Sequence, residues 1–249
     1  MEEFASLMMV TYNRMELTKK MLDNLFLVTD YPFELIIIDN GSTDGTKEYL
    51  YTIAESAVFR ESKLLKQVRL KQNASNLGIA VARNQALSMS EGQWLSTLDN
   101  DVLLPARWLS DCINILKVSP SYGMLGVNME NVNYPIVHNG NLRWQMKPSG
   151  NLGTACTVFS RNLHKLLGYF NTEYGLYGEE DADFGMRVRV AGFKMGYLEA
   201  NGTHLGEGEQ DKGEYREFKT ACHEKNLALF RKNCADYVHG RKSLYIKYP

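Results

Sequence analysis

Uninterrupted apolar runs that end abruptly in polar clusters are the feature that most constrains how this chain can fold. Residues 35–38 form such a run and are followed at once by the polar stretch 39–45, and the short apolar run at 7–10 ends in residues 11–14. A further predicted strand, at residues 94–98, ends at Asp99-Asn100-Asp101. A run without polar alternation is typical of a strand that is covered on both faces. The pattern therefore predicts buried strands with polar loops at their carboxyl ends.

Apolar residues recur at helical spacing between these runs. The spacing predicts helices that contain Leu17, Met21, Leu22, Leu25 and Phe26, then Ile79, Ala82, Ala86 and Leu87, and then Trp108, Leu109, Cys112, Ile113 and Leu116, with Pro105 opening the last. Strands that alternate with helices pair in parallel, and such open sheets bind ligands beyond the carboxyl ends of the strands. We therefore expect an α/β fold with a mostly parallel, Rossmann-like sheet and helices on both faces.

The pattern changes in the second half of the chain. Residues 128–153 are rich in Asn and Gly, which predicts loops or a small β insertion. Beyond them, residues 154–160 and 194–199 predict strands, and residues 181–192 and 215–232 predict helices. With 249 residues, of which 44% are hydrophobic, the chain has room for one large domain or for one domain with a modest appendage.

Charge is balanced over the whole chain but not along it. The 28 Lys and Arg residues oppose 29 Asp and Glu residues, so no chain-wide field would gather nucleic acid or anionic lipid. Residues 212–249 nevertheless carry nine basic and four acidic side chains, a local +5, interleaved with Tyr237, Tyr245 and Tyr248. This segment could be a solvated helix and tail, pack on the body, dimerise, stack on an acceptor, or meet the phosphates of lipid or nucleic acid.

Four scattered cysteines, Cys112, Cys156, Cys222 and Cys234, predict reduced core residues rather than a zinc site or a disulfide framework. Residues 1–10 carry two glutamates where a signal peptide would be basic, and no apolar run reaches the roughly 18 residues of a membrane span. We therefore expect a cytoplasmic protein, and a peripheral contact with a membrane surface is compatible with this.

The sequence Asp99-Asn100-Asp101 follows directly after a predicted strand. Two carboxylates fixed at a strand end supply hard oxygen ligands for Mg²⁺ or Mn²⁺, which commonly complete their shell with phosphate oxygens and water. The pattern Asp-x-Asp also occurs in ordinary solvated loops, so it indicates a metal site only together with the neighbouring motifs.

Five motifs in one order give the chain a family resemblance. They are residues 10–14, residues 38–45, Asn76-Leu77-Gly78 with Ala82-Arg83-Asn84, residues 98–101, and residues 178–184 continued through Arg187, Arg189 and residues 191–193. Together they resemble the family 2 glycosyltransferases of GT-A fold over about residues 7–205. The resemblance implies a glycosyltransferase domain at 1–210, with a nucleotide-binding half at 1–104 and a smaller acceptor-side half at 105–210, and a C-terminal helix and basic tail at 211–249.

The resemblance also implies roles for single residues around a nucleotide-sugar donor, with a UDP-sugar favoured. The implied donor-binding residues are Thr11, Tyr12, Asn13, Arg14, Asp39, Asn76, Gly78, Arg83, Asn84, Asp99 and Asn100. Loops after parallel strands can present such aromatic, carboxylate and amide groups to a flat polar base. Asp44, in contrast, is expected to cap the helix that starts near Gly45.

Catalysis and metal binding are implied for a second group of residues. Asp181 is implied as the general base of an inverting transfer and Glu180 as its support or an acceptor contact. Asp101 is the expected direct ligand of Mn²⁺ or Mg²⁺, with Asp99 on metal-bound water or ribose and His204 as a further ligand. The ordinary alternatives are helix-start carboxylates at 179–183 and a structural histidine at 204.

Two other functions remain open at this level. A sugar-nucleotide nucleotidyltransferase also uses an α/β sheet and a metal, although it would carry a Gly-rich, Arg-containing phosphate loop where this chain has residues 11–14. A catalytically silent protein that binds nucleotide-sugars or glycans would need Asp181 or the Asp-x-Asp to be misplaced. The sequence does not identify the oligomeric state or the acceptor, which could be a glycan, a lipid-linked glycan or a modified nucleic acid. The donor sugar would be decided by residues 153–154 and Trp144.

Overall fold

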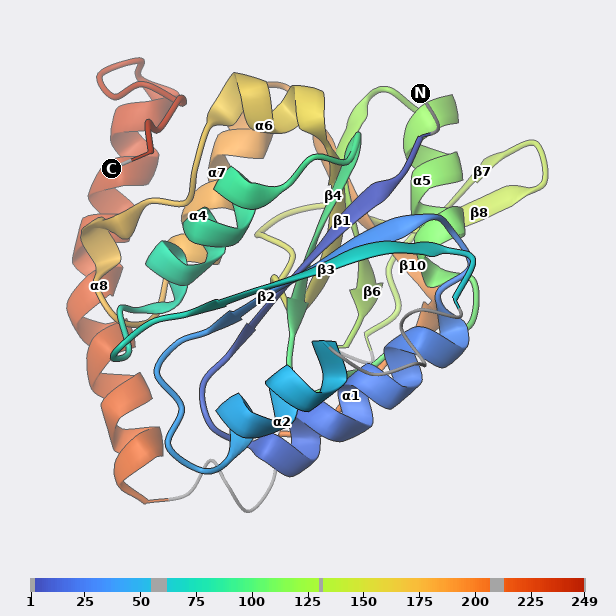
Figure 1. Cartoon of the computed structure of the whole chain (residues 1–249). Helices are drawn as coiled ribbons and strands as arrows, with labels where there is room; N and C mark the ends of the chain where they lie inside the picture. Colours follow the sequence, from blue (N-terminus) through green and yellow to red (C-terminus); the bar gives the residue numbers. More distant parts are fainter. Residues whose placement is uncertain (1–2, 55–61, 130–131, 207–212, 249) are drawn as a thin grey trace.

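A computed structural model of the protein describes residues 3–54, 62–129, 132–206 and 213–248, and within them one nine-stranded sheet forms the centre (Figure 1). The strands of this sheet are β1 (Ala5–Thr11), β2 (Phe33–Asp39), β3 (Leu65–Gln72), β4 (Trp94–Asp99), β6 (Tyr122–Asn128), β7 (Ile136–Asn139), β8 (Leu142–Lys147), β9 (Cys156–Ser160) and β10 (Lys194–Asn201). The helices are α1 (Met15–Val28), α2 (Thr46–Ala54), α4 (Ile79–Met89), α5 (Trp108–Val118), α6 (Arg161–Leu167), α7 (Glu180–Val190) and α8 (Glu214–Val238), with a 3-10 turn, η1 (Thr172–Tyr174).

The central strands are buried on both faces, as the apolar runs predict. Every residue of β1 and β2 is buried, and alternate residues of β1 divide between two cores. Leu7 and Met9 pack with residues of α1, α2 and α5, whereas Met8 and Val10 pack with residues of α4, α6 and α7. Helices on both faces are therefore needed to bury these strands, because successive side chains of a strand point in opposite directions.

The sheet runs in the order β3-β2-β1-β4-β9-β6-β10-β8-β7. The first four strands are parallel, whereas β9 is antiparallel to both β4 and β6. Strand β10 returns to parallel pairing with β6, and a β7–β8 hairpin extends the edge through antiparallel pairing with β10. The fold class is confirmed, and the Asn- and Gly-rich stretch 128–153 contains a β insertion.

Two predicted helices differ in their bounds. The helix behind Pro105 begins only at Trp108, after Arg107 in the left-handed region with φ 64°. The C-terminal helix α8 runs from Glu214 to Val238 and so extends beyond the predicted 215–232. It packs against α7 along one side of the molecule (Figure 1).

The segment after α8 packs on the body. Ile246 forms a parallel bridge with Gly168, and the ring of Tyr248 lies 4.9 Å from that of Tyr169. Of the basic side chains there, Arg241 pairs with Asp236 and Lys242 with Glu173. The expected boundary at 210/211 lies outside the described residues.

The structure also bears on the expectations for the cysteines and for membrane-spanning helices. Cys112 and Cys156 are buried, as expected of core residues, whereas Cys222 and Cys234 are partly exposed, and all four are free cysteines. Among the described helices, none combines the length and apolar character needed to span a bilayer.

Candidate active site

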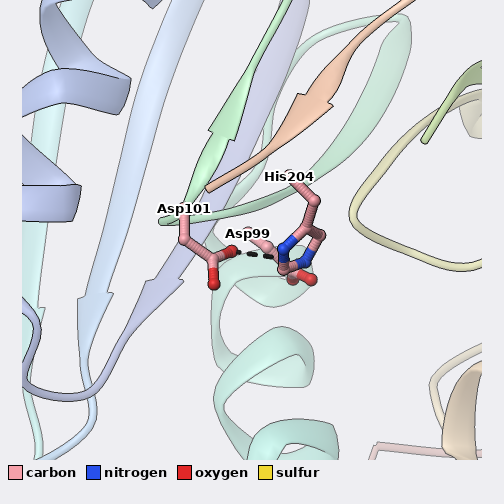
Figure 2. Close-up of side chains that lie close together, drawn as sticks. All are labelled: Asp99, Asp101 and His204. Atoms are coloured by element: carbon pink, nitrogen blue, oxygen red, sulfur yellow. Dashed lines mark ion pairs between the residues drawn. The ribbon is translucent and has the colours of Figure 1, made fainter. Parts of the chain in front are cut away.

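A second, two-stranded sheet assembles a potential metal site at the carboxyl end of β4. The strands β5 (Val102–Leu103) and β11 (Thr203–His204) pair in antiparallel fashion, and Leu205 N–H donates to the Asp101 carbonyl at 2.7 Å. This pairing brings His204 beside Asp99 and Asp101, with one potential ligand atom from each residue lying within 4.8 Å of the others (Figure 2). The three residues that the sequence analysis names as metal ligands therefore lie close together, and metal binding by them stays a prediction.

The donor set fits a divalent cation. Two carboxylates and one imidazole are ligands that Mn²⁺ accepts, and the carboxylates also suit Mg²⁺. The Nδ1 atom of His204 is buried and has no hydrogen-bond partner within the described part of the chain, and Nε2 lies 3.6 Å from Asp101 Oδ1. An imidazole that lies beside two carboxylates offers a nitrogen that a divalent cation can bind, so the residues present fit such an ion.

Arg83 of α4 connects this triad to the acidic cluster. Its Nη2 atom donates to Asp99 Oδ1 at 3.0 Å and its Nη1 atom to Glu180 Oε1 at 2.8 Å. The side chain is only 6% exposed, and the neighbouring carboxylates hold the pKa of the guanidinium above its ordinary value against the effect of burial. One buried cation therefore fixes the two groups of carboxylates at a defined separation.

The acidic cluster begins at a strained turn. Glu179 adopts φ 70°, and Glu180 and Asp181 occupy the first turn of α7. Burial and the nearby Asp181 raise the pKa of Glu180 to about 7 despite Arg83. Burial also raises the pKa of Asp181, although Arg83 and the Ala182 N–H, which donates to Asp181 at 2.7 Å, act in the opposite direction. Crowded, desolvated carboxylates of this kind are suited to accept a proton.

Both groups face one cleft of about 520 Å³. The lining includes all of Asp99, Asp101, His204, Glu180 and Asp181. Gly153 and Thr154, expected to contact a donor sugar, also line it. Trp144 does not and is buried under Tyr122, with the two rings 5.3 Å apart.

The predicted donor-binding residues divide into two sets. Those that line the cleft are Tyr12, Arg14, Asn76, Arg83, Asp99 and Asn100. Tyr12 is 40% exposed at the end of β1, and Arg14 donates to Asp101 Oδ2 at 2.7 Å. These six residues form part of the surface that a ligand in the cleft would meet, although the Asn100 amide nitrogen is bonded within the fold.

The other predicted donor residues do not line the cleft, and their contacts hold the surrounding loops. Asn13 accepts from Thr43 N–H at 2.8 Å, Asp39 accepts from Ser42 N–H at 3.1 Å, and neither lines the cleft. Gly78, with φ 91°, begins α4 at a position where a Cβ atom would meet the Gly175 carbonyl at 2.7 Å. Its role is close packing between two loops.

Two of the residues expected to contact the donor have side chains that bond to other parts of the protein. Asn84 is buried, and its amide donates to the Phe170 carbonyl at 2.9 Å and accepts from the Phe170 N–H at 2.8 Å. The Asn100 amide donates to Thr11 at 3.0 Å and to Thr18 at 2.9 Å, so Thr11 and the Asn100 amide hold β1 to the β4 loop. The side-chain polar groups of Asn84 and Thr11 are thus engaged within the fold.

The capping role expected for Asp44 is confirmed. Its carboxylate accepts from Thr46 N–H at 3.1 Å, where α2 begins, and from Met15 N–H at 3.0 Å, where α1 begins. One side chain therefore caps two helices, and these bonds together lower its pKa despite partial burial.

Helix α8 supplies cleft residues that the sequence motifs did not indicate. Phe218, Lys219 and His223 line the cleft, and Lys219 Nζ lies 5.5 Å from the centre of the Tyr177 ring. His223 forms an ion pair with Glu179 when protonated. The available signal was the spacing of four between Lys219 and His223, which places both on one face of a helix.

Comparisons with known proteins agree with this geometry. The family described as Glycosyl transferase family 2 matches residues 6–168. The chain is 27% identical over 232 residues to a chondroitin synthase of Pasteurella multocida, a match that covers 75% of this chain and 23% of that protein. The chain spans 23% to 52% of the length of four such curated relatives.

Solved structures share the fold at low identity. The mannosyltransferase PcManGT of Pyrobaculum calidifontis, in complex with GDP-Man and Mn²⁺, superposes with a TM-score of 0.63 at 21% identity, covering 95% of this chain and 74% of that one. TarS 1–349 of S. aureus with UDP-GlcNAc gives 0.60 at 20% identity, covering 97% and 74%. With the family match extending over most of the chain, these findings place the protein in glycosyl transferase family 2.

Proposed function

We propose that this protein transfers a sugar from a nucleoside-diphosphate donor to an acceptor hydroxyl, with inversion at the anomeric carbon. The observation that carries the proposal is the single cleft in which the Asp99, Asp101 and His204 triad faces Asp181 across Arg83. The structural neighbours bound to GDP-Man and Mn²⁺ or to UDP-GlcNAc support a nucleotide-sugar donor, with a UDP-sugar favoured.

The donor would lie over the carboxyl ends of β1 and β4. Tyr12 offers an aromatic face to the base, and Asn76 offers an amide beside it. Asp99, Asp101 and His204 would hold Mn²⁺ or Mg²⁺, which when bound supplies positive charge to the diphosphate oxygens. Arg83 and Arg14 orient the two carboxylates through the ion pairs described above.

Asp181 would act as the base. In the proposed step its carboxylate takes the proton of the acceptor hydroxyl, the hydroxyl oxygen forms a bond to the anomeric carbon, and the bond to the diphosphate oxygen breaks. Glu180 is paired with Arg83, which leaves Asp181 to face the acceptor. Attack from the side opposite the leaving group accounts for inversion without a covalent enzyme intermediate.

The acceptor would enter between the acidic cluster and α8. Phe218 and Tyr177 offer aromatic faces to a sugar ring, and Lys219 offers a positive charge. The similarity to a chondroitin synthase supports a glycan, free or lipid-linked. A nucleic acid acceptor gains less support, because Arg241 and Lys242 of the basic tail already pair with carboxylates of the protein.

A donor screen tests this function. UDP-, GDP- and dTDP-sugars are incubated with the protein, and release of the nucleoside diphosphate is measured with Mn²⁺ and with a chelator. We expect metal-dependent release from one donor class. Release of pyrophosphate from a nucleoside triphosphate would instead identify a nucleotidyltransferase, and donor binding without turnover would identify a silent binding protein.

The base assignment needs its own variant. Asp181→Asn should abolish transfer and leave donor affinity within a few-fold by calorimetry. Asp111→Asn, which alters an exposed carboxylate paired with Arg107 on α5, is the matched control and should keep full activity. Normal turnover of Asp181→Asn at saturating donor would contradict the role of Asp181.

A further inference from the structure

One face of α8 closes on the loop that leads into the acidic cluster. The loop comprises residues 174–178, between η1 and Glu179, and α8 lies beyond the segment 6–168 that matches the family. The contacts between helix and loop include buried hydrogen bonds to the backbone of the loop, beside the contacts of Asn233 and Lys219 with the side chains of Tyr174 and Tyr177. A helix outside the family match therefore holds a segment next to the proposed base.

Asn226 makes the central contact. Its side chain is buried, and Nδ2 donates to the Tyr174 carbonyl at 2.7 Å and to the Tyr177 carbonyl at 2.9 Å, with the Gly178 carbonyl at 3.4 Å. An amide nitrogen has two hydrogens, so the two short bonds use both of them. A single side chain thus gathers the carbonyl groups at both ends of the loop.

Two further contacts restrict the position of residues 174–178. Gly178 adopts φ 92°, and a Cβ atom there would lie 3.6 Å from His223 Cα of α8. At its other side, Leu176 accepts a backbone hydrogen bond from Ile79 at 3.2 Å, at the start of α4. The loop is therefore held between α4, which carries Arg83, and α8.

We propose that Asn226 is a positioning residue that places Asp181 for proton transfer by fixing the backbone of residues 174–178. The inference rests on the proposed function, because it assigns Asp181 the role of base. Asn226 lies outside the lining of the cleft, so it acts through the loop and not by contact with substrate. The transfer step requires sub-ångström placement of the base. Donor binding uses residues on the opposite wall of the cleft, so we expect it to depend less on the position of residues 174–178.

Asn226→Ala tests the proposal through two readouts. Donor binding is measured by calorimetry, which gives both affinity and the fraction of competent sites, and transfer is measured at saturating donor. We expect kcat per binding site to fall by roughly 10- to 100-fold, because misplacement of about 1 Å can cost this much, with donor Kd within about twofold. Amide hydrogen exchange in residues 174–181 should become faster.

Asn233→Ala is the matched control. Asn233 is a buried asparagine of the same helix, but its Nδ2 atom donates to the Tyr174 hydroxyl at 3.0 Å and not to the loop backbone. It should lose stability and keep kcat per binding site. Should Asn226→Ala fail to fold, Gly178→Ala perturbs the same loop from within, because alanine resists φ 92°, and it should give the same fall in kcat.

The outcomes separate this inference from the proposed function. Unchanged kcat per site, or unchanged exchange in residues 174–181, in a folded variant would overturn the role of Asn226. A wild-type protein that binds donors but transfers no sugar would overturn the proposed function and this role with it. A loss of competent sites with normal kcat at those that remain would show that Asn226 serves folding alone, and would also overturn the proposal.

Discussion

Glu180→Gln should stabilise the folded protein, and the gain should depend on pH. The Glu180 side chain is 8% exposed, and its Oε2 atom has no hydrogen-bond partner among the described residues. Its pKa rises from the ordinary 4.5 to about 7 because burial and Asp181 outweigh the attraction of Arg83. Glutamine has nearly the same shape as the protonated acid, so it removes the cost of ionising this buried group.

The sign and size of the effect follow from proton linkage. The folded state holds the Glu180 proton more tightly than the unfolded state does, so the free energy of unfolding falls as pH rises from about 4.5 to about 7. The difference between the folded and unfolded pKa of Glu180 corresponds to a loss of stability of about 3 kcal/mol at pH 8 and about 1 kcal/mol at pH 5. The glutamine variant should therefore gain about 3 kcal/mol at pH 8 and progressively less in acid.

Urea unfolding at 25 °C, with a chelator present, measures this difference. The two proteins should unfold with the same m value, so that the shift in midpoint reports stability alone. Glu173→Gln is the control, because the Lys242 ammonium beside it lowers the pKa of that exposed carboxyl and the substitution should bring no gain. A Glu180→Gln variant that is less stable at pH 8, or whose gain does not change with pH, would refute the reasoning.

Two further predictions concern neighbouring residues. Asn84→Ala should lower the free energy of unfolding by about 2–4 kcal/mol, because both backbone polar groups of buried Phe170 lose their partner, and donor Kd should stay within about twofold. A large loss of donor affinity with normal stability would instead show that Asn84 contacts the donor. In the pH profile of kcat/KM, the acid limb should lie above the ordinary carboxyl pKa of about 4. The reason is that burial raises the pKa of Asp181 and a base is active only when it is deprotonated. An acid limb at or below pH 4 would argue against Asp181 as the base.

Much of the N-terminal half of the fold could be predicted from the sequence, because its signals are local. The continuous apolar run of β2 requires burial on both faces, and the polar residues that follow it must then lie at the carboxyl edge of the sheet. The strand predicted at residues 94–98 in the same way located Asp99 and Asp101 at the end of β4. A strand and the loop behind it are adjacent in sequence and in space, so pattern alone is sufficient.

The direction in which a polar side chain points is not a local property. Asn76 lines the cleft and Asn84 holds the Phe170 backbone, although both lie in the same family motif. Thr11 and Tyr12 are neighbours in the chain, yet Thr11 accepts from Asn100 and Tyr12 faces the cleft. Whether an amide or hydroxyl meets a ligand or a backbone group depends on which segments pack against it.

The sequence by itself determined the class of fold, the strand ends that carry the polar clusters and the two carboxylates of the Asp-x-Asp. Only the tertiary structure decided that β11 pairs with β5 to bring His204 to these carboxylates, that Arg83 joins them to Glu180, and that α8 forms a wall of the cleft. The physical reason is separation along the chain. The periodicity of a strand or helix indicates which of its faces is buried. Packing between segments far apart in sequence determines which element covers that face and which charged groups lie beside it.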